Sequence, residues 1–192
     1  MRIAIRSFAR QAGQLVKLAT PKLTYRTIDP LRDAELTVQH QIDACVATFG
    51  TDAPFQGTDR YLRWLTSKVD EFPDGFLLAY LGDRCVGQLE LEVPYGLSTG
   101  YVNLFYLTRE FRGIGFGPLL HERAEFYFRS WEATSITLHV SPTNHAAMRF
   151  YRRMGYTRTF AASERRLWEM SKDLRCQIQR PQVFPGASEN SG

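Results

Sequence analysis

The chain has 192 residues, of which 44% are hydrophobic and 23% are charged, with a formal net charge of +4. These proportions are typical of one globular domain that is large enough to bury a core. No apolar run approaches the ~20 residues that a membrane-spanning helix needs, so we expect no such helix.

The three cysteines are odd in number and far apart in the sequence. They are Cys45, Cys85 and Cys176, and none stands at a spacing typical of metal ligands. Reduced thiols in an intracellular protein are the simplest interpretation, and we expect a cytoplasmic location. The histidines also lack partners at a useful ligand spacing, so we expect no metal.

The positive charge is concentrated in an N-terminal extension, residues 1–22. Six basic residues and no acidic residue precede Asp29, whereas the rest of the chain has 18 basic and 20 acidic residues. On a helix, a basic face would oppose an apolar face. The basic face comprises Arg2, Arg6, Arg10, Gln14 and Lys17, and the apolar face comprises Ile5, Phe8, Ala12, Leu15 and Val16.

Such an amphipathic helix needs something to cover its apolar face. We favour packing on its own domain or docking on a partner, for which a homodimer is one arrangement. Contact with a membrane surface and a mitochondrial presequence are the alternatives. We expect no nucleic-acid partner.

The domain proper, which we expect over residues 23–175, begins with a short strand and two helices. Residues 23–28 alternate like a strand that is broken at Pro30. Helical spacing follows over residues 33–49, and Thr58, with the aspartate after it, would cap a second helix. The second helix carries the apolar residues Tyr61, Leu62, Trp64 and Leu65.

A hairpin and a central strand are expected next. Residues 76–81 and 84–93 flank a turn at Gly82, and the apolar run 102–107 has the composition and length of a strand. A helical pattern then extends to Phe128.

The last part of the domain alternates strands and a helix. Residues 135–140 predict a strand, residues 145–154 a helix, and residues 157–160 and 167–170 two final strands. The whole order is β-α-α-β-β-β-α-β-α-β-β. Residues 176–192 contain two prolines and little that can be buried, so we expect a flexible tail.

A glycine-rich loop joins the central strand to the following helix. Its sequence is Arg112-Gly113-Ile114-Gly115-Phe116-Gly117, closed by Pro118. Glycines accept positive φ and allow a ligand to approach the backbone, and the N–H groups of a helix start favour an anion. The loop therefore predicts a phosphate or pyrophosphate site, with a plain tight turn as the alternative.

Two familiar phosphate loops do not fit this sequence, since the Rossmann fingerprint needs a glycine at Pro118 and the P-loop needs Gly-Lys-Ser/Thr. The loop instead resembles the Arg/Gln-x-x-Gly-x-Gly/Ala pyrophosphate loop of the GNAT superfamily of acetyl-CoA-dependent N-acetyltransferases. A second signature of this family is matched at the family's spacing. It is Leu138-His139-Val140-Ser141-Pro142-Thr143-Asn144, continued by Asn144-x-x-Ala147-x-x-Phe150-Tyr151-x-x-x-Gly155-Tyr156. The resemblance covers roughly residues 24–174 and is strongest over residues 103–156.

The resemblance implies an α/β (α+β) fold with a mixed, mostly antiparallel sheet flanked by helices. The fourth and fifth strands, here residues 102–107 and 135–140, would splay apart and hold the pantetheine arm of acetyl-CoA. The backbone of Leu107 would face this arm, and the amides of Arg112 to Gly117 would hold the pyrophosphate. Asn144 would contact the arm, although its position equally suits a helix N-cap.

Tyr151 occupies the position of the family's general acid, beside the cofactor. Its phenol, with an ordinary pKa of ~10, is protonated at neutral pH and would give its proton to the departing thiolate. An aromatic ring that packs between helix and sheet is the alternative.

The general base is left open by the sequence. Many family members have a glutamate where Asn103 stands, and asparagine cannot accept a proton. His139 lies where the ribosomal-protein N-terminal acetyltransferases have a glutamate, and a pKa of ~6.5 suits a base, although a satisfied core histidine is the alternative. Glu90 and Glu92 share one strand face and would bind the amine or relay its proton through water, unless this face is simply solvated.

We therefore expect an N-acetyltransferase that moves an acetyl group from acetyl-CoA to a primary amine, of a small molecule or a protein, by direct transfer in a ternary complex. A catalytically weak acetyl-CoA-binding module, acting as a sensor or interaction domain, is the alternative that Asn103 favours and Tyr151 opposes. A nucleic-acid or membrane adaptor that uses residues 1–22 is a second alternative.

Overall fold

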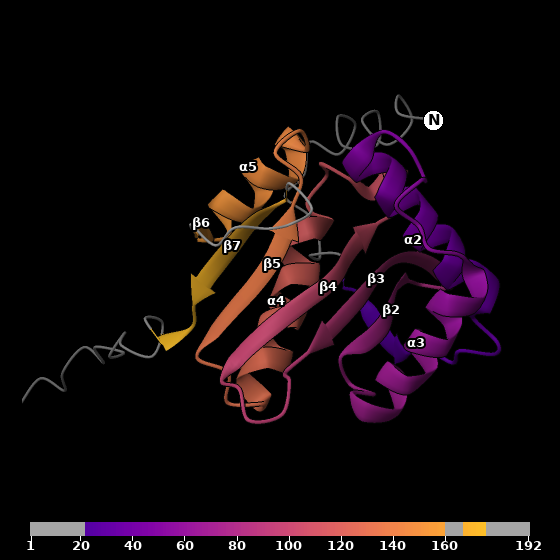
Figure 1. The fold of residues 1–192 in the computed structure, drawn as a ribbon, viewed down its shortest axis with the longest axis horizontal. Helices are drawn as coiled ribbons and strands as arrows, with labels where there is room; N and C mark the ends of the chain where they lie inside the picture. The colour runs from indigo at the N-terminus through magenta and orange to yellow at the C-terminus, as the bar shows by residue number, and fades with distance from the viewer. Residues whose placement is uncertain (1–21, 160–166, 176–192) are drawn as a thin grey trace, which may run out of the picture.

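The computed structural model describes residues 22–159 and 167–175, and a seven-stranded sheet runs through this part of the chain (Figure 1). The strands are β1 (Thr24–Thr27), β2 (Phe76–Leu81), β3 (Arg84–Glu92), β4 (Thr99–Leu107), β5 (Ser135–Val140), β6 (Thr157–Arg158) and β7 (Trp168–Asp173). The helices are α2 (Ala34–Phe49), α3 (Thr58–Glu71), the 3-10 helix η1 (Arg109–Phe111), α4 (Phe116–Ser130) and α5 (His145–Arg153).

The sheet is mixed and mostly antiparallel. Its strand order is β1-β2-β3-β4-β5-β7-β6, and only the β4–β5 pair is parallel. Both this architecture and the order of elements along the chain confirm the fold class that the sequence predicted.

Glycines fix several of the element boundaries. Gly50 ends α2 in the left-handed conformation (φ 76°), with its N–H donating to the carbonyl of Val46 at 2.9 Å. The predicted cap of α3 at Thr58 is wrong, because the helix already begins there and Gly57 stands at the N-cap. Gly57 takes φ 96°, a conformation that residues with a Cβ rarely adopt, and the chain turns one residue earlier than expected.

Two strands are longer than predicted. β4 begins at Thr99 rather than at residue 102, and β7 continues to Asp173 rather than ending at residue 170. The end of β7 is polar, which hid its strand character, but Asp173 still pairs with Ser135 of β5.

The parallel strands β4 and β5 are paired over only part of their length. β4 pairs with β5 only from Thr99 to Val102, opposite Ser135 to Leu138. Beyond this point β4 runs on beside β3 to Leu107 without β5 as a neighbour. This confirms the splayed fourth and fifth strands.

A β-bulge marks the point of divergence. Glu90 of β3 lies opposite Leu104 of β4, whereas the next residue, Leu91, lies opposite Val102. Asn103 is therefore the extra residue of β4, and the bulge changes which face the following side chains present.

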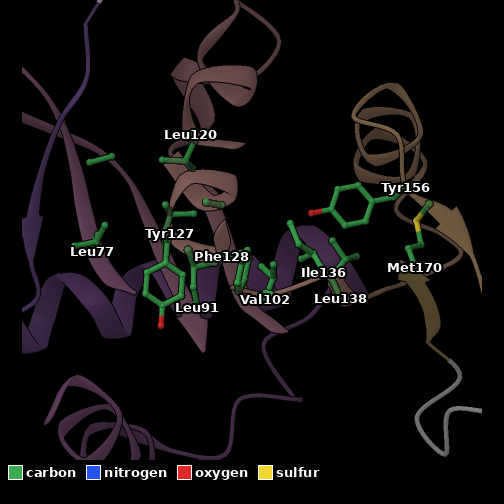
Figure 2. Close-up of a cluster of buried hydrophobic side chains, with 14 of the residues drawn as sticks. Leu77, Leu91, Val102, Leu120, Tyr127, Phe128, Ile136, Leu138, Tyr156 and Met170 are labelled. Carbon is green, nitrogen blue, oxygen red and sulfur yellow. The ribbon is translucent and has the colours of Figure 1, made fainter. Parts of the chain in front are cut away.

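One face of the sheet packs on α4. The buried side chains of Leu120, Tyr127 and Phe128 from α4 lie against apolar residues of the sheet such as Leu91 (Figure 2). Burial of each such side chain contributes roughly 1.5–3 kcal/mol. The contact needs a glycine on β4, because a Cβ on Gly100 would lie only 2.2 Å from Cδ1 of Phe128.

The other face packs on α2 and α3 and is less uniform. Leu65, Phe76 and Leu78 form a second apolar cluster there. Gln88 and Glu90 of β3 are also fully buried on this side, so a polar group lies inside the protein next to an apolar core.

Several predictions fall outside the described residues. These are the N-terminal helix over residues 1–21, residues 160–166, the tail and Cys176. Within residues 22–159 and 167–175, no helix is long and apolar enough to cross a membrane.

Candidate active site

The glycine-rich loop forms the start of α4. Gly113 and Gly115 have φ values of 75° and 103°, and Gly115 is the N-cap of the helix. In the described part of the chain, no residue accepts a hydrogen bond from the N–H of Gly113, Ile114 or Gly115. Unpaired amides at a helix start attract a phosphate group, so the loop fits the pyrophosphate of a nucleotide cofactor.

The end of β4 lies beside this loop. The N–H of Thr108 donates to the carbonyl of Val86 in β3 at 2.9 Å, so the polar groups of the preceding residue, Leu107, face away from β3 and toward the strand gap. Here the Leu107 carbonyl accepts a hydrogen bond from Nε of Arg112 at 2.7 Å. A ligand that uses this carbonyl would either share it with the exposed Arg112 side chain or displace that side chain, because a carbonyl oxygen can accept two hydrogen bonds.

Tyr151 of α5 stands on the α4 side of the gap. Its ring contacts Phe105, which belongs to the part of β4 that β5 does not accompany, with centroids 6.3 Å apart. Phe150 and Tyr156 complete its surroundings at 5.4 and 5.5 Å. Burial raises the pKa of Tyr151, which keeps the phenol protonated and able to donate at neutral pH. The Tyr151 ring packs among other aromatic rings, as the alternative interpretation expected. Its hydroxyl nevertheless keeps the proton that a general acid needs.

Asn144 is the N-cap of α5. Its Oδ1 accepts a hydrogen bond from the N–H of Ala147 at 3.1 Å. The capping role that the sequence allowed is thus confirmed. No described residue accepts a hydrogen bond from its Nδ2, which leaves a donor for a ligand.

A pocket of about 820 Å³ opens on the α2–α3 side of the same gap. Its walls come from α2, the loop before α3, α3 itself and the strands β3, β4 and β5. The lining residues are Gln41, Ala44, Cys45, Thr48, Phe49, Pro54, Phe55, Gln56, Arg60, Tyr61, Trp64, Glu90, Tyr101, Val102, Asn103, Leu104, His139 and Leu167. Three residues that the sequence analysis singled out, Glu90, Asn103 and His139, therefore come together in one site.

Glu90 is the buried carboxyl of this pocket. Its Oε1 accepts hydrogen bonds from the Tyr61 hydroxyl at 2.6 Å and from Nε2 of Gln88 at 2.7 Å, whereas its Oε2 has no described partner. Burial raises the pKa of Glu90 to about 7, with a contribution from Glu92, although the two hydrogen bonds act in the opposite direction. The solvated strand face considered above is thus wrong for Glu90, because α3 covers it.

Glu92 lies on the same strand face but outside the pocket. Its Oε2 forms an ion pair with Nζ of Lys68 at 2.5 Å. Glu92 therefore does not line the pocket with Glu90 and His139, although it lies near enough to Glu90 to raise its pKa. The charge of Glu92 is balanced by Lys68 of α3.

His139 lies one residue beyond the last β4–β5 pair. The side chain is exposed, and Nδ1 is 2.8 Å from the Tyr101 hydroxyl. It is therefore not the satisfied core histidine that was considered as an alternative. It contributes to the mouth of the pocket rather than to its interior.

The residues that hold Glu90 were not singled out as site residues by the sequence analysis. Nδ1 of buried His40 lies 2.9 Å from Oε1 of Gln88, which can only accept, so this nitrogen carries the proton. Burial lowers the pKa of His40 and keeps the ring neutral. The signal available was the alternation of Gln88, Glu90 and Glu92 in a central strand, where polar residues must find partners.

The part of the chain that the structure describes contains no group of three or more His, Cys, Asp or Glu residues placed to hold a metal ion.

Comparison with known proteins indicates the family of this chain. Residues 40–156 match the Acetyltransferase (GNAT) family. An uncharacterised N-acetyltransferase of Methanocaldococcus jannaschii is 34% identical over 86 residues, which are 44% of this chain and 54% of that protein. N-alpha-acetyltransferase 30 of Schizosaccharomyces pombe is 29% identical over 93 residues, 47% of this chain and 62% of that protein. The matches thus span only about half to three-fifths of these relatives.

Solved structures agree on the fold. The crystal structure of the PaiA N-acetyltransferase of Thermoplasma acidophilum in complex with coenzyme A is 18% identical, with a TM-score of 0.60, and the match covers 79% of this chain and 99% of that one. The chain therefore shares the fold of this N-acetyltransferase. Because the family match spans more than half of its length, the chain belongs to the acetyltransferase (GNAT) family.

Proposed function

We propose that the protein is an N-acetyltransferase that transfers an acetyl group from acetyl-CoA directly to a primary amine. One observation carries this proposal: the β4–β5 gap adjoins both a site suited to an anionic cofactor and a pocket suited to an ammonium group. Amides without a described acceptor lie in the loop that follows β4, and a pocket with the buried carboxyl of Glu90 opens on the α2–α3 side of the gap. The names of both relatives, which are N-acetyltransferases, support the same activity.

The residues on the cofactor side would divide the task. The amides of Gly113, Ile114 and Gly115 would hold the pyrophosphate, and Arg112, once it leaves the Leu107 carbonyl, would add a positive charge. Phe116 and Gly117 continue the helix start, and Nδ2 of Asn144 would donate to the pantetheine arm. When bound, acetyl-CoA supplies the acetyl group as a thioester whose carbonyl carbon the amine attacks, so that a C–N bond forms and the C–S bond breaks.

Tyr151 would supply the proton that the departing sulfur needs. Its raised pKa keeps it protonated across the neutral range, and its position next to Phe105 puts it beside the open part of β4. It would recover a proton from solvent after each turnover.

Glu90 would accept the proton of the incoming ammonium. A base is most effective when its pKa lies near the working pH, and the pKa of Glu90 lies at about 7. The ammonium loses two protons in all, of which one is balanced by the proton on the thiol and the other leaves to solvent. His139, at the mouth of the pocket, is the alternative base, and Glu92 is disfavoured by its ion pair with Lys68.

A catalytically weak acetyl-CoA-binding module is the second candidate. Asn103 favours it, because this residue lines the pocket and cannot take a proton. The contact of Arg112 with the Leu107 carbonyl also favours it, since this carbonyl is already engaged by a side chain of the protein.

We further infer that the protein works in the cytoplasm. The described cysteines, Cys45 and Cys85, are free thiols, which supports a reducing compartment.

Calorimetry with CoA tests the first requirement of the proposed function, which is that the protein binds CoA at the glycine-rich loop. Gly115→Asp should weaken CoA binding by ~10²-fold, because it strains a left-handed position and places a carboxylate where phosphate binds. Gly96→Asp is the matched control: Gly96 also has a positive φ (75°) and open space around it, but it lies in the turn before β4. If the wild-type protein ignores CoA at millimolar concentration, the proposed function is wrong.

A further inference from the structure

The acceptor pocket contains two charged groups that no opposite charge in the described part of the chain balances. Glu90 is bonded only to the neutral groups of Tyr61 and Gln88. Arg60, the exposed residue just before Tyr61 on α3, has no described carboxylate within 4.0 Å. The nearby Lys68 differs, since it pairs with both Glu71 and Glu92.

These two groups do not pair with each other, although both line the pocket. Adjacent residues of a helix point in different directions, so Tyr61 is buried and reaches Glu90 whereas Arg60 stays at the solvent side. The pocket therefore has an anionic interior and a cationic mouth, and its ligand must satisfy both.

The walls between the two charges are apolar and aromatic. Phe55 lies 6.2 Å and Trp64 6.0 Å from the Tyr61 ring, measured between centroids. Phe49 and Tyr101 also line the space. Such walls favour an apolar or flat body, and aromatic faces also favour an ammonium group.

The polar groups that line the pocket do not suit a polyamine as the acceptor. Glu90 is the one carboxyl among the described lining residues, whereas a ligand with several ammonium groups needs several. Nδ2 of Asn103 is buried and unpartnered among the described residues, and it is a donor that suits an oxygen acceptor of the ligand rather than a second ammonium.

We propose that the acceptor is a zwitterionic amine: one primary ammonium at Glu90 and one carboxylate at Arg60, joined by an apolar or aromatic body. This inference rests on the proposed function and specifies the chemical class of its acceptor amine. A free amino acid and the end of a short peptide share this chemistry, and the test separates them.

The experiment measures CoA release by the full-length enzyme with pairs of acceptors that differ in one carboxylate. The pairs are phenylalanine and phenethylamine for a free amino acid, glycylphenylalanine and glycine phenethylamide for a peptide, and aminomethylbenzoate and benzylamine for a longer spacing. We expect at least one carboxylate-bearing member to exceed its partner in kcat/KM by ~10-fold or more, and spermidine to be poor.

Arg60→Gln should abolish this preference by raising KM for the carboxylate-bearing member only. Arg63→Gln is the matched control, because Arg63 is exposed on the same helix but does not line this pocket. A preference that survives Arg60→Gln, or a better rate with spermidine or with every decarboxylated partner, would overturn the inference. If no amine at all releases CoA, the proposed function itself fails, and the inference fails with it.

Discussion

The two faces of the sheet differ in what they bury. The α4 face buries apolar side chains, among them Leu120, Tyr127 and Phe128. The α2–α3 face also buries an apolar cluster, but beside that cluster it buries the hydrogen-bonded groups of Glu90, Gln88, Tyr61 and His40. One strand, β3, supplies both faces. The α4 face, called here the apolar face, thus contributes stability through apolar burial. The α2–α3 face, called here the polar face, also surrounds a carboxyl whose pKa is raised by burial to about 7.

Leu120→Ala would break the apolar face and should have the largest effect. The side chain is fully buried, and its truncation leaves a cavity that lowers the free energy of unfolding by about 2–5 kcal/mol. Denaturation by urea measures this change. We expect kcat per folded molecule to stay near the wild-type value, and a large loss of kcat with unchanged stability would contradict the division between the faces.

Tyr151→Phe tests whether the Tyr151 hydroxyl, which lies where the α4 face meets the β4–β5 gap, acts as the general acid. Removal of the hydroxyl should lower kcat by ~10²-fold with little change in CoA affinity or thermal stability, because the ring packing remains. Tyr156→Phe provides a control, as this buried tyrosine contacts Tyr151 on the same side. A Tyr151→Phe enzyme with the wild-type kcat would return this residue to packing alone.

Glu90→Gln tests, through the free energy of unfolding, whether the polar face raises the pKa of this carboxyl. The folded protein holds the pKa of Glu90 at about 7, above its ordinary value of 4.5. Between these values the folded state binds more protons than the unfolded state, so the contribution of Glu90 to stability decreases as pH rises from about 4.5 to about 7. Glu90→Gln should therefore be more stable than wild type by roughly 1–3 kcal/mol at pH 8 and by much less at pH 4.5. Equal stability differences at both pH values would show that the folded protein does not raise the pKa of Glu90.

The sequence predicted the elements of the apolar face and the position of the glycine-rich loop well, because these depend on local signals. Periodicity located β5, Gly82 located the hairpin turn, and glycine spacing located the start of α4. Asn144 was correctly recognised as suited to cap α5.

The polar face could not be predicted to the same depth. Alternation placed Glu90 and Glu92 on one face, but only the packing of α3 decides that Tyr61 covers Glu90 and that Lys68 neutralises Glu92. The sequence placed Tyr61 on the second helix, but the carboxyl that its hydroxyl contacts is 29 positions away in the chain. Long-range contacts of this kind leave no local pattern.

The pH dependence of kcat/KM, measured in parallel for wild type, Glu90→Gln and His139→Ala, tests the central claim most directly. We predict a wild-type activity that falls with decreasing pH through about 7, the pKa of Glu90. Glu90→Gln should lose this limb and at least ~10²-fold in rate, whereas His139→Ala should keep the limb. A limb that disappears in His139→Ala and persists in Glu90→Gln would assign the base to His139 and contradict the role given to the buried carboxyl.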